Sequence, residues 1–199
     1  YHAITLNIGI GISKFNPQEI RGKTRYLDLQ GHFYARKWNI DLLGEFYRGY
    51  YLTPKGMAAP SGESYYKRKD LALDLIGGAF DRSLNDRRFS YQAGLLQNEW
   101  QKNSAGSVLA GAEIYYGAIH GDSLLSPSRL DSNYRKQGID RVHFFELGPG
   151  IGYGYTLVIR EHFFMLASFT VNLALRVSVE HADFSGRHGN RIDFTPNDN

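Results

Sequence analysis

His120, Asp122 and Ser123 stand within four residues of one another in the segment AIHGDS, residues 118–123. A histidine can take the proton of a serine hydroxyl while a third polar group orients the imidazole, which is the chemistry of a nucleophilic hydrolase. Catalytic groups converge in space rather than in sequence, so three neighbouring polar residues also fit an ordinary polar loop. We therefore keep these residues as weak catalytic candidates and prefer the loop interpretation.

A second candidate group is a set of acidic residues on the polar side of alternating segments, accompanied by His32 and Arg176. Paired carboxylates could perform acid–base chemistry or contact a divalent cation. An unpaired buried charge is costly, so we expect these acids to form a structural network with inward arginines, for which Arg25, Arg48 and Arg176 are available. The expected network consists of Asp28, His32, Asp41, Glu45, Asp74, Glu113, Glu146 and Arg176.

Two further segments could bind a ligand. Glu99, Trp100 and Gln101 combine an apolar ring with polar neighbours, as a sugar-stacking site does, although Trp100 also fits the aromatic girdle of a membrane protein. Tyr65 and Tyr66 flank the long connection 50–68, and tyrosine-bearing loops often contact partners; ordinary loop packing is the default for them. No other group points to a metal or a cofactor, and we expect neither.

The elements that must position these residues are β-strands. In ITLNIGIGI, residues 4–12, isoleucine and leucine occupy every second position, and this period of two recurs along the chain. The same alternation sets Leu27, Leu29 and Phe33 against Asp28, Gln30 and His32. The expected strands are 4–12, 26–35, 38–47, 70–80, 88–96, 107–117, 143–157 and 164–179, about eight in all.

Alternation alone does not decide which face points inward. A soluble barrel turns its apolar face in, whereas an outer-membrane barrel turns it out toward lipid. The polar face here is rich in acids, amides and glycine and poor in lysine, the strands have the roughly 9–11 residues that a tilted crossing needs, and aromatic residues gather near strand ends. These features favour a transmembrane barrel over a soluble one.

Composition narrows the classes further. The 199 residues fit one domain, and the chain has a net charge of +3 with its basic residues scattered in short clusters, which argues against a nucleic-acid partner. Cysteine is absent, which excludes disulfide scaffolds and thiol catalysis. No apolar run reaches the ~18 residues of a membrane helix.

The stretch GPGIGYGYTLV, residues 148–158, has glycine at positions 148, 150, 152 and 154. The spacing of two does not match the dinucleotide-binding fingerprint, and no helical pattern follows. We expect all four glycines to share one face of one strand, where they leave room for bulky side chains or for a bend in the wall.

The connections give the expected order of the wall. Residues 35–37 and 159–162 look like tight turns and 81–87 like a modest one, whereas 50–68 and 118–140 are long and polar. Strict alternation of short and long connections fails between residues 97 and 141. The chain ends in RIDFTPNDN, a loop-like stretch, so we expect a complete barrel of 10–12 strands with terminal strands missing from residues 1–199.

Several motifs resemble one family. The runs 97–101, 104–107, 115–117 and 121–123, together with the glycine stretch, are similar to an uncharacterised family of outer-membrane β-barrels from Bacteroidetes-type bacteria, catalogued as a domain of unknown function. The resemblance implies an exported barrel and brings no activity, so no catalytic residue is carried over from it.

We therefore expect an all-β, antiparallel outer-membrane barrel with a polar, largely plugged lumen. Its expected role is that of a structural or accessory subunit of a cell-envelope complex, or of a surface-binding barrel. The expected partners are outer-membrane lipid or lipopolysaccharide and other envelope proteins. The alternatives are a hydrolase that modifies lipid A or phospholipid, and a small passive pore.

Overall fold

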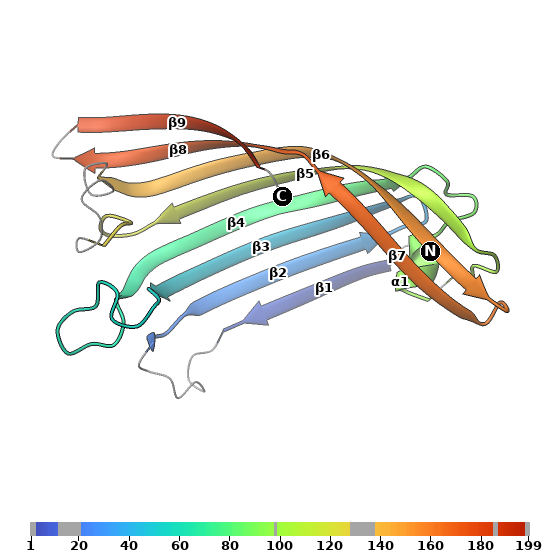
Figure 1. Cartoon of the computed structure of the whole chain (residues 1–199), viewed down its shortest axis with the longest axis horizontal. Coiled ribbons are helices and arrows are strands. Elements are labelled where there is room, and N and C mark those ends of the chain that lie inside the picture. Colours follow the sequence, from blue (N-terminus) through green and yellow to red (C-terminus); the bar gives the residue numbers. More distant parts are fainter. Residues whose placement is uncertain (1–2, 12–20, 98, 128–137, 185–186, 198–199) are drawn as a thin grey trace.

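The computed structural model describes the chain except for residues 1–2, 12–20, 98, 128–137, 185–186 and 198–199, and for 3, 182–184 and 187–197 it describes the backbone. The described residues are almost entirely β-structure (Figure 1). The elements are β1 (Ala3–Ile10), β2 (Arg25–Tyr34), β3 (Trp38–Tyr51), β4 (Lys67–Ser83), α1 (Tyr91–Leu95), β5 (Ala105–His120), β6 (Ile139–Ile159), β7 (Phe163–Asn172), β8 (Ala174–Phe184) and β9 (Arg187–Asn197).

All strands belong to one antiparallel sheet. Consecutive strands pair with each other, except that β7 and β8 both pair with β6 and not with each other. β7 and β8 pair with successive parts of the long strand β6, and only Leu173 separates them. β7 and β8 therefore occupy one strand position in the sheet, and the described strands fill eight such positions, the number expected from the sequence.

The sheet has two chemically different faces. The outer face carries large apolar side chains on every strand from β1 to β7, and Leu6, Ile151 and Phe169 expose 67%, 65% and 72% of their surface there. Asp28, His32 and Asp41 lie on the opposite, inner face: His32 on β2 is directly opposite Asp41 on β3, and Asp28 is opposite Glu45. The alternation predicted for the first three strands is confirmed.

β4 departs from the prediction. The alternation along residues 70–80 predicts that Leu71, Leu73 and Leu75 share the apolar face and that Asp74 lies on the polar face. In the structure Asp74 lies opposite Phe46 and Ala118 on the outer face, and Leu75 lies opposite Glu45 on the inner face. The assignment of Asp74 to the polar network is therefore wrong: this strand has apolar residues on both sides, so alternation cannot orient it.

The segment 88–96 is also not a strand. Residues Tyr91–Leu95 form the short helix α1, which starts after Ser90, whose hydroxyl accepts a hydrogen bond from the Ala93 amide. α1 lies within a long connection, 84–104, between β4 and β5. Strict alternation of short and long connections fails here because this long connection joins β4 to β5 at the end of the sheet that otherwise carries the short turns 35–37 and 160–162.

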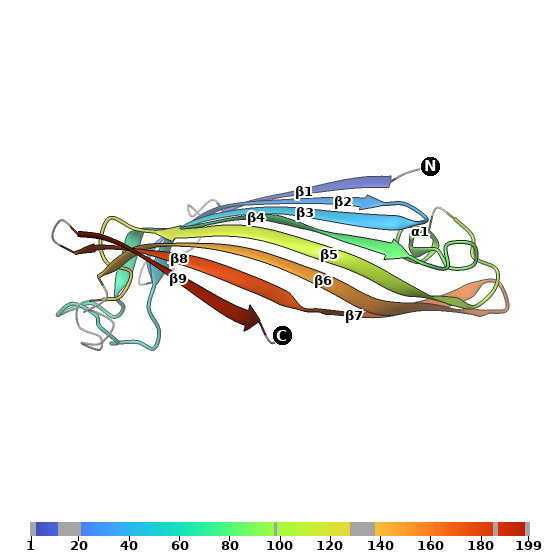
Figure 2. The same cartoon turned by 90° about the horizontal axis from the view of Figure 1, so that it is seen from above.

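The 84–104 connection folds back over the inner face, and α1 lies between the ends of β2 and β3 and those of β6 and β7 (Figure 2). The Gln92 amide donates to the Tyr34 carbonyl at the end of β2, and Gly94 lies against Leu166 of β7. Phe89, Gln92, Leu109 and Thr156 are the largest fully buried side chains in the described part. The buried core therefore sits between this connection and the inner face of β5 and β6.

The glycine stretch on β6 serves this packing. Its four glycines lie on the inner face in register with the inner residues of β5. A Cβ on Gly154 would lie 2.8 Å from Cζ of Phe89, and one on Gly148 would meet the backbone at the joint between β7 and β8. Gly154 thus leaves room for the bulky side chain of Phe89, whereas a bend of the wall at the glycines stays a prediction.

The sheet is curled but not closed into a barrel, because no ladder joins β1 to β9 in the part of the chain that the structure describes. β9 is a strand paired with β8 where the sequence indicated a loop. The accessible surface is 13780 Å², against about 9,500 Å² for a compact protein of this mass. Among the described residues, no helix has the length and apolarity to cross a membrane.

Candidate functional site

The 84–104 connection builds the candidate site at the end of the sheet where the short turns lie. Ser90 is its anchor: its hydroxyl donates to Glu99 Oε2 at 2.7 Å, and its amide donates to Gln101 Oε1 at 3.1 Å. The side chain that caps α1 thus also holds the 99–101 strip in place. The side chains of Glu99 and Gln101 are held by these hydrogen bonds with Ser90, and Trp100 between them projects outward.

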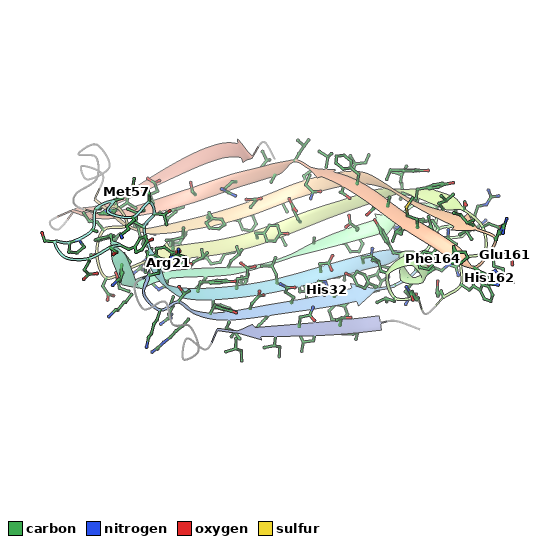
Figure 3. All side chains as sticks on the ribbon, turned by 60° about the horizontal axis from the view of Figure 1, so that its bottom comes forward. Arg21, His32, Met57, Glu161, His162 and Phe164 are labelled. Atoms are coloured by element: carbon green, nitrogen blue, oxygen red, sulfur yellow. The ribbon has the colours of Figure 1, made fainter. Side chains whose placement is uncertain are left out.

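Trp100 projects from this strip with 66% of its surface exposed. Its indole Nε1 donates to the Glu161 carbonyl at 2.9 Å, and its ring meets the His162 ring edge-on at 6.3 Å. Glu161 and His162 belong to the turn between β6 and β7, at the end of the sheet where Figure 3 labels them. The ring is therefore fixed in orientation while its surface stays open to a ligand.

Two cavities flank Trp100. The larger, of about 770 Å³, is lined by four cations, by Glu99 and by backbone and side-chain polar groups. The smaller, of about 410 Å³, lies between Trp100 and the Glu161–His162 turn and includes Phe164. Both have the size range of small-molecule sites, although both are open to solvent. The cations of the larger cavity are Arg36, Arg87, Arg88 and Lys102.

The groups around Trp100 are suited to binding a ligand. An aromatic plane stacks on a sugar ring or another flat apolar surface, and several cations around one acid favour an anionic ligand. The Lys102 ammonium lies 5.6 Å from the centre of the Trp100 ring, so it also stabilises that plane. Glu99, Trp100 and Gln101 are consecutive residues of this connection, and their role in binding a ligand stays a prediction; no binding role was predicted for the surrounding arginines. Their shared location, at connections on one end of a meander, is the signal that could have identified them.

Tyr65 and Tyr66 lie at the opposite end of the sheet, where Figure 3 labels Met57 and Arg21. Tyr65 packs edge-on against Tyr51 with ring centres 5.4 Å apart, and the Tyr66 carbonyl accepts from the Leu52 amide. These contacts close the 52–66 connection on itself. The two tyrosines therefore share no site with Trp100, and their observed contacts are those of loop packing.

His120, Asp122 and Ser123 are close in space but not joined. Among the described residues, no hydrogen bond links any two of these three side chains. Asp122 uses its backbone amide to donate to Asp70 Oδ2 at 3.0 Å, and Ser123 uses its carbonyl to accept from Arg68 at 3.1 Å. The segment is thus a loop whose backbone is held by β4.

Arg68 and Asp70 form the clamp that holds it. The guanidinium, only 7% exposed, donates through Nε and Nη2 to the Asp70 carboxylate and through Nη1 to the Leu124 carbonyl at 2.6 Å. Hydrogen bonds from Arg68 hold the pKa of Asp70 at about 2, below its ordinary 3.8, against the opposing effect of burial. The sequence did not single out this pair.

The inner-face network is made of separate pairs. His32 Nδ1 lies 2.6 Å from Asp41 Oδ1, and Arg176 contacts Glu146 Oε2 through Nε and Nη2 at 2.9 and 2.6 Å. Glu113 accepts from the Asn172 amide at 3.0 Å. Figure 3 places His32 midway along the sheet, between its two ends.

The remaining members of the expected network are not bridged by arginine. Asp28 accepts from its neighbour Gln30 and lies opposite Glu45. Arg25 and Arg48, which the sequence offered as partners for these acids, lie opposite each other in register with Ala72 and on the outer face. The prediction that they neutralise the inner acids is wrong, because both lie where the strand parity turns them outward.

Comparison with known proteins gives the family. Residues 1–196 match the model of the family described as Domain of unknown function (DUF4421), and the chain belongs to this family. No curated protein matches the chain, and no solved structure matches it.

Proposed function

We propose that this member of the DUF4421 family is an outer-membrane β-barrel protein of Bacteroidetes-type bacteria that acts as an accessory subunit of a cell-envelope complex or as a surface-binding barrel. The observation that carries the proposal is the outer face, which presents large, exposed apolar side chains on successive strands in the part of the chain that the structure describes. A soluble protein rarely leaves so large an apolar surface in water. The acyl chains of a lipid bilayer would cover this apolar outer face.

The inner face supports the same arrangement. It carries Asp41, Glu113 and Glu146 in hydrogen-bonded pairs, as a polar barrel interior does. Among the described strands, none pairs with the outer edge of β1 or of β9, and a lipid-exposed strand cannot keep unpaired backbone groups in a bilayer. In the proposed barrel both edges are paired, either with each other or with strands that complete the wall.

The 84–104 connection favours a binding or accessory role over conduction. It covers the inner face at one end, where its residue Phe89 is fully buried against Gly154 of β6. The cavities around Trp100 lie on the same connection and give the protein a surface for an anionic saccharide or another envelope component. A hydrolase is the weaker alternative, because the His120, Asp122 and Ser123 side chains are not bonded to one another among the described residues.

The absence of cysteine allows a direct test of the lipid-facing wall. Single cysteines at Phe169 and Val171 on the outer face, and at Ser168 and Thr170 on the inner face of the same strand, are labelled with an environment-sensitive fluorophore. After reconstitution into vesicles with bromine-labelled acyl chains, we expect quenching at the two outer positions and little at the two inner ones. Equal quenching at all four, or a folded protein in the soluble fraction without detergent, contradicts the proposal.

The accessory role has its own test. Mild detergent extraction of tagged protein from native membranes should yield a complex with partners in fixed stoichiometry. A protein that purifies alone and conducts ions in planar bilayers would support the pore instead.

A further inference from the structure

One cross-strand row on the outer face is basic. Following the registers from strand to strand, each residue of the row lies directly opposite the next one. Side chains that are directly opposite in an antiparallel sheet point to the same face. The row, called here the basic row, consists of Arg25 on β2, Arg48 on β3, Ala72 on β4, His120 on β5, Arg141 on β6 and His181 on β8.

The basic row has no acidic counterpart of its own. Among the described residues, no ion pair involves Arg25, Arg48 or Arg141, and all three side chains are exposed. Arg25 faces Arg48 directly, and Arg141 faces His120 and His181. The guanidinium groups of Arg25 and Arg48 are like charges in directly opposite positions, which repel and destabilise the pairing unless an anion from outside the sheet lies between them.

The next row toward the middle of the sheet defines the surroundings of these cations. It carries Asp74 on β4, beside the uncharged Ala72, and His143 on β6, whose Nδ1 lies 2.8 Å from the Tyr116 hydroxyl. The His143 and His181 rings meet edge-on with centres 5.5 Å apart. On β4 the basic row has the uncharged Ala72, with Asp74 beside it. Ala72 therefore separates an arginine pair on β2 and β3 from a larger basic group on β5, β6 and β8.

The position of the basic row identifies its ligand. It borders the apolar outer face at the end where the 52–66 connection and residues 121–127 lie, with Ile76 and Ile114 on its apolar side. Long cationic side chains at such a border extend toward the polar surface while their stems stay on the apolar side. Anionic lipid headgroups occupy this level of a membrane, and basic residues there attract them.

We propose that the basic row binds the phosphate groups of anionic membrane lipids, with Arg25 and Arg48 forming one site and His120, Arg141 and His181 forming a second. This inference rests on the lipid-facing wall proposed above. It adds to that proposal a lipid class, a membrane level and the residues that recognise the headgroup.

The test uses vesicles of about one part phosphatidic acid to nine parts phosphatidylcholine, in which one or the other lipid carries bromine on its acyl chains. A fluorophore on a cysteine replacing Ala118, next to the basic row, reports the lipid beside the larger group, and a fluorophore replacing Ile114 reports the apolar face. At Ala118 we expect brominated phosphatidic acid to be enriched over its bulk share about fivefold, the effect of one basic residue near a lipid surface. The variant R141Q should remove most of this enrichment.

The matched control is R82Q. Arg82 is an exposed arginine on the outer face of β4, opposite Trp38 and Ala110 at the other border of the sheet, so its loss should leave the signal at Ala118 unchanged. Inorganic phosphate, compared with chloride at equal ionic strength, separates the two sources of the anion. If it abolishes the enrichment, the row is a free-phosphate site and the lipid inference fails.

The remaining outcomes distinguish failure of the lipid site from failure of the lipid-facing wall on which it rests. Quenching at Ile114 by both lipids, without enrichment at Ala118 or with enrichment that survives R141Q, overturns the lipid site and leaves the lipid-facing wall intact. Absence of quenching at Ile114 overturns the wall and the lipid site together.

Discussion

The ring of Phe89 lies directly against Gly154, so that a Cβ on the glycine would be 2.8 Å from Cζ of the ring. Phe89 belongs to the 84–104 connection and Gly154 to the strand β6. The contact therefore ties the segment that carries the Trp100 cavities to the wall of the sheet. Predictions about stability and binding follow from this and from the pairs described above.

Replacement of Gly154 by alanine should destabilise the fold. The fully buried Phe89 ring would have to move, and overpacking of this kind costs roughly 1–3 kcal/mol in the free energy of unfolding. Urea unfolding in detergent micelles measures it. Gly31→Ala is the control, because the nearest atom to its added Cβ lies 3.8 Å away. Equal stability of the two variants would refute the packing account.

Loss of the Glu146–Arg176 pair should depend on which partner is removed. Arg176→Met leaves the Glu146 carboxylate, 8% exposed, without its cation, and such an uncompensated buried charge costs about 3 kcal/mol. The double variant with Glu146→Gln should recover most of that loss. A double-mutant cycle of unfolding free energies measures the coupling, with the exposed Lys37–Asp86 pair as a reference expected to contribute under ~0.5 kcal/mol. Purely additive losses would show that the two groups do not interact.

The clamp between Arg68 and Asp70 should make stability depend on acidity. The pKa of Asp70 is lowered to about 2 from 3.8, so its contribution is fully present above the unfolded value and is lost as the pH falls from 3.8 toward 2. The shift corresponds to roughly 2 kcal/mol. Asp70→Asn should remove this acid-dependent part of the unfolding free energy and speed proteolysis near residues 121–125. An unchanged pH profile would contradict the assignment.

Trp100 should report binding of an anionic saccharide. In a Trp38→Phe background it is the sole tryptophan, since the chain has two. Titration with glucose phosphate should change its emission at lower concentrations than glucose does, and Arg87→Gln with Arg88→Gln should weaken the phosphate response about fivefold or more. Lys55→Gln, at the other end of the sheet, is the control. Identical curves for the two sugars would exclude a role for the cations.

Ser123→Ala should leave the lipid composition of the envelope unchanged. Ser123 contributes its carbonyl to Arg68, and the substitution keeps that carbonyl. Lipid mass spectrometry of cells with either variant measures the outcome. A changed lipid A or phospholipid profile would restore the hydrolase hypothesis.

Part of the site could be predicted from residue type alone. Glu99, Trp100 and Gln101 were recognisable because an exposed aromatic ring between polar residues suits ligand binding. Their cationic surroundings were not, since Arg36 comes from the β2–β3 turn and Arg87 and Lys102 come from separate parts of the 84–104 connection, and these meet only in the folded sheet.

The sequence by itself determined the β-class, the period of two and the faces of β1, β2, β3 and the glycine-bearing part of β6, because there most large apolar residues share one side and the acids, amides or glycines share the other. It did not determine β4, where Leu75 and Ile76 give both sides an apolar residue and only pairing with β3 selects the outward one. The predictions of a strand at residues 88–96 and of a loop at the end of the chain were wrong. The secondary structure of these two segments depends on Ser90 and on the edge of β8, which are contacts of the folded chain rather than properties of a short segment.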